Sequence, residues 1–167
     1  MSAFMLSQIL VGIAIVFDLL SFQFKQRQKI VACLCVAGAL ICSHFVLLEQ
    51  WTAAGLMAIA TARYLTSVFS TSKVLMGVFI TSSAAVTVVT FSGVASLLSF
   101  AGSALQTTAA FCRADKKLRQ MMILGTSFWL VHNYWVGSPT AVLMEVLFIG
   151  SNLVGYYRFY WRPAKSA

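Results

Sequence analysis

Residues 94–119 read VASLLSFAGSALQTTAAFCRADKKLR, and this stretch indicates the fold class of the chain. Residues 94–112 contain no charged side chain, and they run directly into a short basic cluster. A helix needs roughly 20 predominantly apolar residues to cross a bilayer, so the uncharged part is long enough for one crossing. The basic cluster then marks the end of that crossing at a membrane surface.

The same alternation of apolar and basic segments extends along all 167 residues. Of the lysines and arginines, Arg63 alone lies outside four short patches. These patches are Lys25/Arg27/Lys29, Lys73, Arg113/Lys116/Lys117/Arg119 and Arg158/Arg162/Lys165. The sequence therefore predicts an all-α membrane protein with seven transmembrane helices. We expect these helices at residues 4–22, 30–48, 51–70, 74–91, 94–112, 120–136 and 140–157.

Composition supports a lipid-embedded chain. Hydrophobic residues make up 60% and charged residues 10%, whereas a soluble domain has about 25% charged residues. The net charge of +8 is divided among loops and forms no continuous basic groove, so we expect no nucleic-acid partner. The four cysteines lie inside or at the edges of apolar runs, which favours packing over metal ligation. We expect the bilayer as a partner, no metal, no cofactor and no cleavable signal.

The distribution of basic residues predicts the orientation. The predicted loops 1–2, 3–4 and 5–6 and the C-terminal tail hold every basic residue of the four patches, whereas the other loops hold none. Basic loops remain cytoplasmic, so we expect the N-terminus outside and the C-terminus in the cytoplasm of a bacterial inner membrane.

An internal repeat is predicted from the spacing of the two large basic loops. At an offset of 88 residues Lys29 falls on Lys117 and His44 on His132, and helix boundaries and loop charge also coincide. Residues 1–73 and 94–167 then form two like-oriented three-helix repeats, and residues 74–93 carry a linking helix. Parallel repeats of this kind occur in SWEET transporters. One chain supplies both repeats, so a monomer suffices and a homo-oligomer stays possible.

Several motifs resemble the YgjV family of bacterial inner membrane proteins. They are the stretches VHNYWVGS at 131–138, SHFVLL at 43–48 and ARYL at 62–65, with Met144-Glu145, Asn152 and Arg158-Phe159. That family is similar in architecture to the SWEET and PQ-loop (MtN3-like) transporters, so the resemblance implies a 3+1+3 arrangement and a small-solute carrier. The hinge prolines and Pro-Gln motif of SWEET proteins are missing, since the chain has only Pro139 and Pro163. We therefore do not expect sugar transport by a proline-hinged route.

Polar residues near the middle of the predicted spans form an inner layer. Asp18, Arg63 and Asn152 lie slightly toward the cytoplasm, and Tyr64 is the repeat equivalent of Asn152. An ionisable residue inside a span costs several kcal/mol, so each is a candidate functional residue. An Asp18–Arg63 ion pair that only holds the bundle together is one interpretation. In a second interpretation, these four residues bind substrate, and the Arg63 guanidinium holds an anionic or carbonyl group. An Arg63 side chain that extends to the cytoplasmic surface is a third.

A second polar layer lies nearer the outside. It comprises Glu145, His132, His44 and Asn133, and the sequence suggests a bond from Glu145 to one of the two histidines. Histidine titrates near neutral pH, so this group is a candidate for gating or proton coupling. The alternative is that the buried polar groups only satisfy each other.

Two functions agree with these features. The first is a secondary transporter or facilitator of a small polar metabolite, bound near the midplane between the repeats. The second is a non-transporting membrane receptor or assembly partner on the same scaffold. We expect no enzyme, because the chain has no Gly-rich phosphate loop, no metal-ligand spacing and no activated nucleophile.

Overall fold

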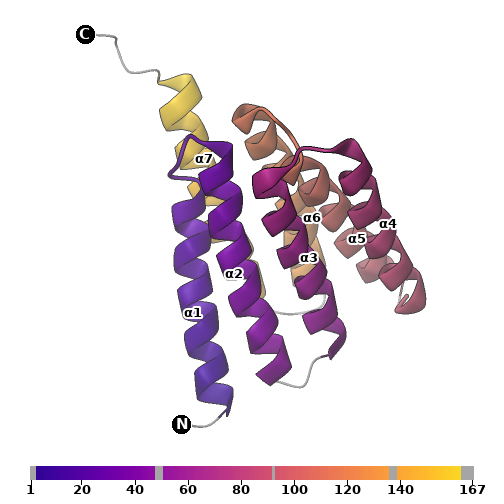
Figure 1. The fold of residues 1–167 in the computed structure, drawn as a ribbon. Coiled ribbons are helices and arrows are strands. Elements are labelled where there is room, and N and C mark those ends of the chain that lie inside the picture. Colours follow the sequence, from indigo (N-terminus) through magenta and orange to yellow (C-terminus); the bar gives the residue numbers. More distant parts are fainter. Residues whose placement is uncertain (1–2, 48–50, 92, 136–138, 163–167) are drawn as a thin grey trace.

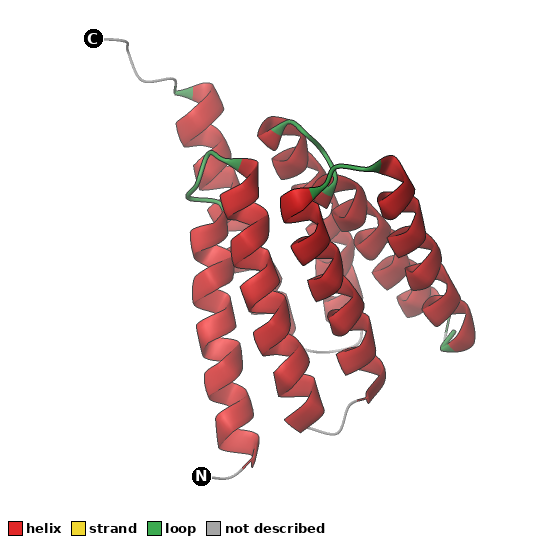
Figure 2. Cartoon of the chain, in the orientation of Figure 1, coloured by secondary structure: helices red, strands yellow, loops and turns green. Residues whose placement is uncertain are grey.

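The computed structural model describes residues 3–47, 51–91, 93–135 and 139–162. Over these residues every regular element is a helix (Figure 1; Figure 2). The elements are α1 (Ala3–Ser21), α2 (Arg27–Leu47), α3 (Trp51–Phe69), α4 (Lys73–Val89), α5 (Val94–Ala110), α6 (Asp115–Trp135), α7 (Pro139–Tyr156) and a π-helical turn, η1 (Tyr157–Trp161). The prediction of an all-α chain with seven helices is confirmed.

Two helix starts differ from the prediction by three residues or more. Helix α2 begins at Arg27 instead of residue 30, and α6 begins at Asp115 instead of residue 120. A hydropathy criterion ends a span at the first charged residue, but a helix can extend beyond the apolar region. The Asp115 carboxylate also lies in the first turn of α6, where the helix dipole favours negative charge. Much of the basic segment 113–119, predicted as a loop, is therefore helical.

The helices form two groups that meet along two edges. In the first group, α2 packs between α1 and α3, and in the second, α6 packs between α5 and α7. We call α1–α3 the first unit and α5–α7 the second unit. The units meet where α1 contacts α7 and where α3 contacts α5, and α4 packs against α3 and α5. Glycine permits a close approach of α5 and α6: Gly102 of α5 faces Gly125 of α6, where an added Cβ would lie 3.0 Å from the opposite carbonyl oxygen.

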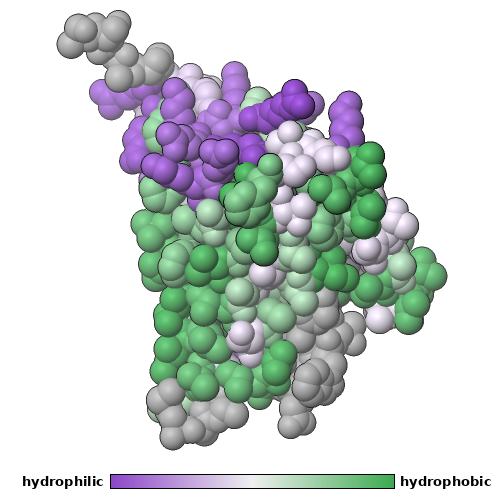
Figure 3. All heavy atoms as spheres, viewed as in Figure 1, coloured by the Kyte–Doolittle hydropathy of each residue, from purple (hydrophilic) through white to green (hydrophobic). Residues whose placement is uncertain are grey.

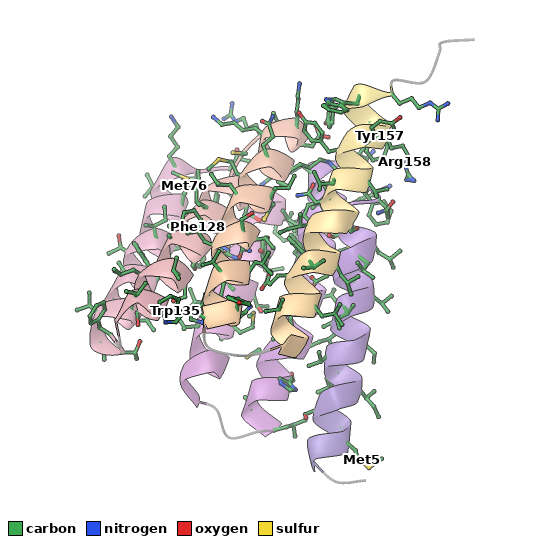
Figure 4. All side chains as sticks on the ribbon, turned by 180° about the vertical axis from the view of Figure 1, so that it is seen from behind. Met5, Met76, Phe128, Trp135, Tyr157 and Arg158 are labelled. Carbon is green, nitrogen blue, oxygen red and sulfur yellow. The ribbon has the colours of Figure 1, made fainter. Side chains whose placement is uncertain are left out.

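Charge gathers at one end of the bundle. Hydrophilic residues cover the end at which η1 and the start of α2 lie, and apolar side chains cover the sides (Figure 3). We call this end, which carries the exposed Lys25, Lys29, Lys73 and Arg113, the basic end. Met5 of α1 lies at the opposite end from Arg158 (Figure 4). Large apolar side chains are exposed along the helices between the two ends, as expected for lipid-facing surfaces.

One segment of the described chain, Arg27–His44, is long and apolar enough by itself to cross a bilayer. Shorter apolar helices occur at Met5–Ser21, Leu56–Phe69 and Lys73–Val89. Seven bilayer crossings therefore stay a prediction.

A fully buried layer lies just inside the basic end. Phe22, just after α1, belongs to one buried cluster with Ile30 and Val31 of α2 and Leu118 and Met122 of α6, all of them 0% exposed. The Phe22 ring also meets the Phe148 ring of α7 edge-on, with 4.9 Å between centroids. This layer fills the interior of the bundle just inside the basic end.

Candidate functional site

A cavity of about 500 Å³ lies between the two units, and all seven helices contribute to its wall. Its volume falls within the roughly 300–1,000 Å³ typical of small-molecule sites. Most lining side chains are apolar or aromatic. The ionisable side chains that line it are Asp18 of α1, Arg63 and Tyr64 of α3, His132 of α6 and Glu145 of α7.

The cavity brings together most of the predicted polar residues. Of the inner layer, Asp18, Arg63 and Tyr64 line it, and of the outer layer, Glu145, His132 and Asn133 line it. The two layers predicted from depth along the helices are thus parts of one space.

Asn152 lies outside the lining of this cavity. The side chain is completely buried, and its Nδ2 donates a hydrogen bond to the Arg119 carbonyl oxygen at 2.9 Å. Its Oδ1 finds no hydrogen-bond partner in the described structure. The amide therefore joins α7 to α6. The sequence had suggested that it faces Arg63 across the cavity, and the structure places it elsewhere. The reason is rotational, since Asn152 lies on the face of α7 that packs on α6.

His44 is also outside the cavity lining, and both histidines bond to backbone. His44 Nδ1 lies 3.1 Å from the Ser7 carbonyl oxygen of α1, and His132 Nδ1 lies 2.8 Å from the Ala95 carbonyl oxygen of α5. Each histidine thus ties the second helix of its unit to the first helix.

The Arg63 side chain is buried in the bundle and does not extend to a surface of the molecule. It is 3% exposed, and its Nη1 donates to Thr107 Oγ1 at 2.8 Å and to the Ser103 carbonyl oxygen at 3.3 Å, both on α5. The guanidinium carbon lies 4.4 Å from the centre of the Tyr64 ring. Within the described chain Arg63 and Asp18 form no ion pair, so the predicted pair is wrong. Arg63 instead joins the two units through α3 and α5.

Glu145 has a different partner from the one predicted. Its Oε1 accepts a hydrogen bond from Asn133 Nδ2 at 3.3 Å, so the neighbour of His132 in the sequence provides the contact. The expected bond from Glu145 to a histidine is therefore wrong. Adjacent residues of a helix point about 100° apart, and depth alone could not distinguish position 132 from position 133.

Two arginines join the units at the basic end, and sequence reasoning had counted them only as loop charges. Arg119 of α6 is completely buried and donates to the carbonyl oxygens of Phe22, at 2.8 Å, and Phe24. Arg27 of α2 donates to the carbonyl oxygens of Ala110, at 2.7 Å, and Ser67. We call these contacts the arginine clamps. Arginine suits such sites because its planar group offers several donors to the free carbonyls at a helix end.

The clamps also require a glycine. A Cβ on Gly155 of α7 would overlap both the Phe22 carbonyl oxygen and Nη1 of Arg119. The helix ends and the guanidinium can therefore pack together only because position 155 lacks a side chain. By contrast, a Cβ on Gly150 of the same helix would have no atom within 4 Å.

Comparison with known proteins identifies relatives over nearly the full chain. Residues 5–162 match the Imp-YgjV family model, described as a bacterial inner membrane protein. The chain is 28% identical over 165 residues to "Inner membrane protein YgjV" of Escherichia coli (strain K12), covering 99% of this chain and 90% of that protein. No solved structure matches the chain. The chain belongs to the Imp-YgjV family of bacterial inner membrane proteins.

Proposed function

We propose that this chain is a secondary transporter or facilitator that moves a small polar metabolite across the bacterial inner membrane. The observation that carries this proposal is the cavity of about 500 Å³, whose wall is formed by all seven helices and includes buried ionisable groups. Charged groups inside a span are costly and commonly mark solute or ion pathways. A sealed core would have supported the alternative, a receptor or assembly partner without transport.

Cavity-lining residues that correspond under the predicted repeat support the proposal further. Five pairs of cavity-lining residues are separated by the predicted offset of 88 positions. These pairs are Asp18 and Gln106, Ile41 and Trp129, Leu56 and Met144, Met57 and Glu145, and Ala60 and Phe148. The two histidine contacts also correspond at this offset. His44 and His132 are 88 positions apart, and so are the residues whose carbonyl oxygens they contact, Ser7 and Ala95. We therefore assign the chain a 3+1+3, SWEET-like arrangement with residues 74–93 as the linker, and a binding site on the pseudo-axis.

The arginine clamps support an alternating-access mechanism. One acceptor of each clamp is equivalent in the two units, since Phe22 and Ala110 lie 88 positions apart. Each clamp reaches from one unit to the end of the first helix of the other unit. With basic loops in the cytoplasm, the clamps and the buried layer form a cytoplasmic gate. Opening this gate while the outer ends of the helices close would release the solute to the cytoplasm.

Thiol labelling tests this mechanism. With the four native cysteines replaced by serine, Ala60→Cys introduces one thiol in the cavity wall. We expect a membrane-impermeant maleimide to label it in right-side-out vesicles and to label it weakly in inverted vesicles. Gly155→Ala and Arg119→Gln should raise labelling in inverted vesicles severalfold by opening the gate. Gly150→Ala is the matched control and should label as the parent does.

Transport itself is measured by swelling of proteoliposomes in iso-osmotic sugars, amino acids, amines and organic acids. We expect one class to enter faster than in protein-free liposomes, and entry to be altered by Arg63→Ala. A thiol that is unreactive from both sides, together with no swelling in any solute, would contradict transport and favour the receptor function.

A further inference from the structure

We infer that the cavity recognises a solute carrying a protonated amine on an apolar body, with Glu145 and Asp18 as its anionic partners. This inference rests on the proposed transport function and specifies its substrate class. Three observations support it: the burial of the two carboxyl groups, the separate engagement of Arg63, and the aromatic wall beside Glu145.

Both carboxyl groups are buried beside the cavity. Asp18 is 8% exposed and Glu145 is 9% exposed, and both line the same space. In the described chain no hydrogen bond or ion pair reaches the Asp18 carboxylate, and the Glu145 carboxylate receives its hydrogen bond from the neutral amide of Asn133. Keeping a carboxyl group ionised at such a buried position costs several kcal/mol unless a cation lies close to it. A cationic ligand would remove that cost.

Among the described residues, the single buried cation of the cavity wall is bound elsewhere. Arg63 donates through Nη1 to Thr107 and Ser103 of α5 and stacks on Tyr64, while its buried Nε has no hydrogen-bond partner among the described residues. The Thr107 hydroxyl is itself oriented by a 2.7 Å hydrogen bond to the Ser103 carbonyl oxygen, which stabilises this arrangement. With Nη1 of Arg63 held against α5, the carboxyl groups on α1 and α7 are the ionisable acids of the wall that no described cation neutralises.

The wall beside Glu145 suits an organic cation better than a hydrated metal ion. Trp129 and Phe148 line the cavity together with Glu145, and Phe148 lies one helical turn further along α7. Trp129 packs edge-on against His132, with 5.4 Å between ring centroids, so the indole is held in position. Aromatic faces attract ammonium groups and also cover apolar carbon atoms. Among the described residues no group of three His, Cys, Asp or Glu side chains is arranged to hold a metal ion.

The test uses three probes of similar shape and different charge: phenethylammonium, phenethyl alcohol and phenylpropionate. Their effect on the melting temperature of the full-length chain in detergent is measured over a concentration series. We expect phenethylammonium to stabilise the protein and the two other probes to have at least about tenfold lower affinity, which corresponds to roughly 1.4 kcal/mol.

Charge-neutral variants locate the site. Glu145→Gln and Asp18→Asn keep the side-chain shape and remove one buried charge each, so both variants should fold. Each should weaken phenethylammonium binding about tenfold or more. Asp115→Asn, at the basic end and outside the cavity lining, is the control and should bind as the parent does.

Two results would overturn the inference. One is stabilisation by phenylpropionate that is lost in Arg63→Ala, which would assign the cavity to an anion. The other is that no probe shifts the melting temperature, although the Ala60→Cys variant shows the labelling pattern expected of an alternating-access carrier. That combination would leave the transporter proposal intact and reject an amine as its solute, whereas failure of the labelling test would reject transport itself.

Discussion

At the residue scale, one hydrogen bond at the basic end makes the folded state less stable at alkaline pH. The Tyr160 hydroxyl of η1 donates to the Asp115 carboxylate in the first turn of α6. Burial and this carboxylate raise the pKa of Tyr160 to about 12, compared with about 10 for an unperturbed tyrosine. The folded state therefore holds the phenolic proton more tightly than the unfolded state does. The resulting stabilisation is complete below about pH 10 and is lost as the pH rises toward 12.

Tyr160→Phe should remove this effect. We expect the loss of thermal stability between about pH 10 and 12 to become shallower, because no proton is then held preferentially at this position. A spectroscopic titration of the phenolates should also lose its most alkaline step. Tyr157→Phe, at a neighbouring exposed position of η1, is the control. A pH profile unchanged by Tyr160→Phe and changed by Tyr157→Phe would contradict the assignment.

At the element scale, close contact between α5 and α6 depends on a pair of glycines. A Cβ on Gly125 would lie 3.0 Å from the Gly102 carbonyl oxygen and 2.9 Å from Cγ of Gln106. Gly125→Ala should force the two helices apart and lower the free energy of unfolding by about 1–3 kcal/mol. Gly150→Ala, with open space around the new methyl group, should stabilise α7 by up to about 1 kcal/mol. Denaturant unfolding in detergent measures the free energy of unfolding of both variants. Equal changes in the two variants would contradict tight packing of α5 on α6.

At the scale of the whole molecule, an odd number of helices leaves the two chain ends on opposite sides. Helix α1 begins at the end of the bundle opposite to η1 (Figure 1). In a bilayer the basic end should face the cytoplasm. A reporter that is active only outside the cytoplasm should therefore work at the N-terminus, and a cytoplasmic reporter should work at the C-terminus. Both ends on one side would reject seven crossings and, with them, parallel repeats.

The pattern along the chain was sufficient for the number of helices, their approximate ends and the gathering of charge at one end of the bundle. Bilayer thickness sets the length of an apolar segment, and loop charge sets its orientation, so both properties can be found without knowledge of any contact. The depth of Asp18, Arg63, Glu145 and His132 along their helices also follows from counting residues at about 1.5 Å each. This is why most of the predicted polar residues do line one cavity.

The partner of each polar side chain depended on how the helices are rotated and packed against each other. A shift of one residue turns a side chain by about 100°, so Asn133 and not His132 contacts Glu145, and Asn152 faces Arg119 instead of the cavity. Helix ends mattered as well, because α6 begins at Asp115, ahead of the predicted start at residue 120, and thereby carries Arg119 into the interior. Charge and hydropathy are properties of single residues, whereas a contact is a property of two helices in three dimensions.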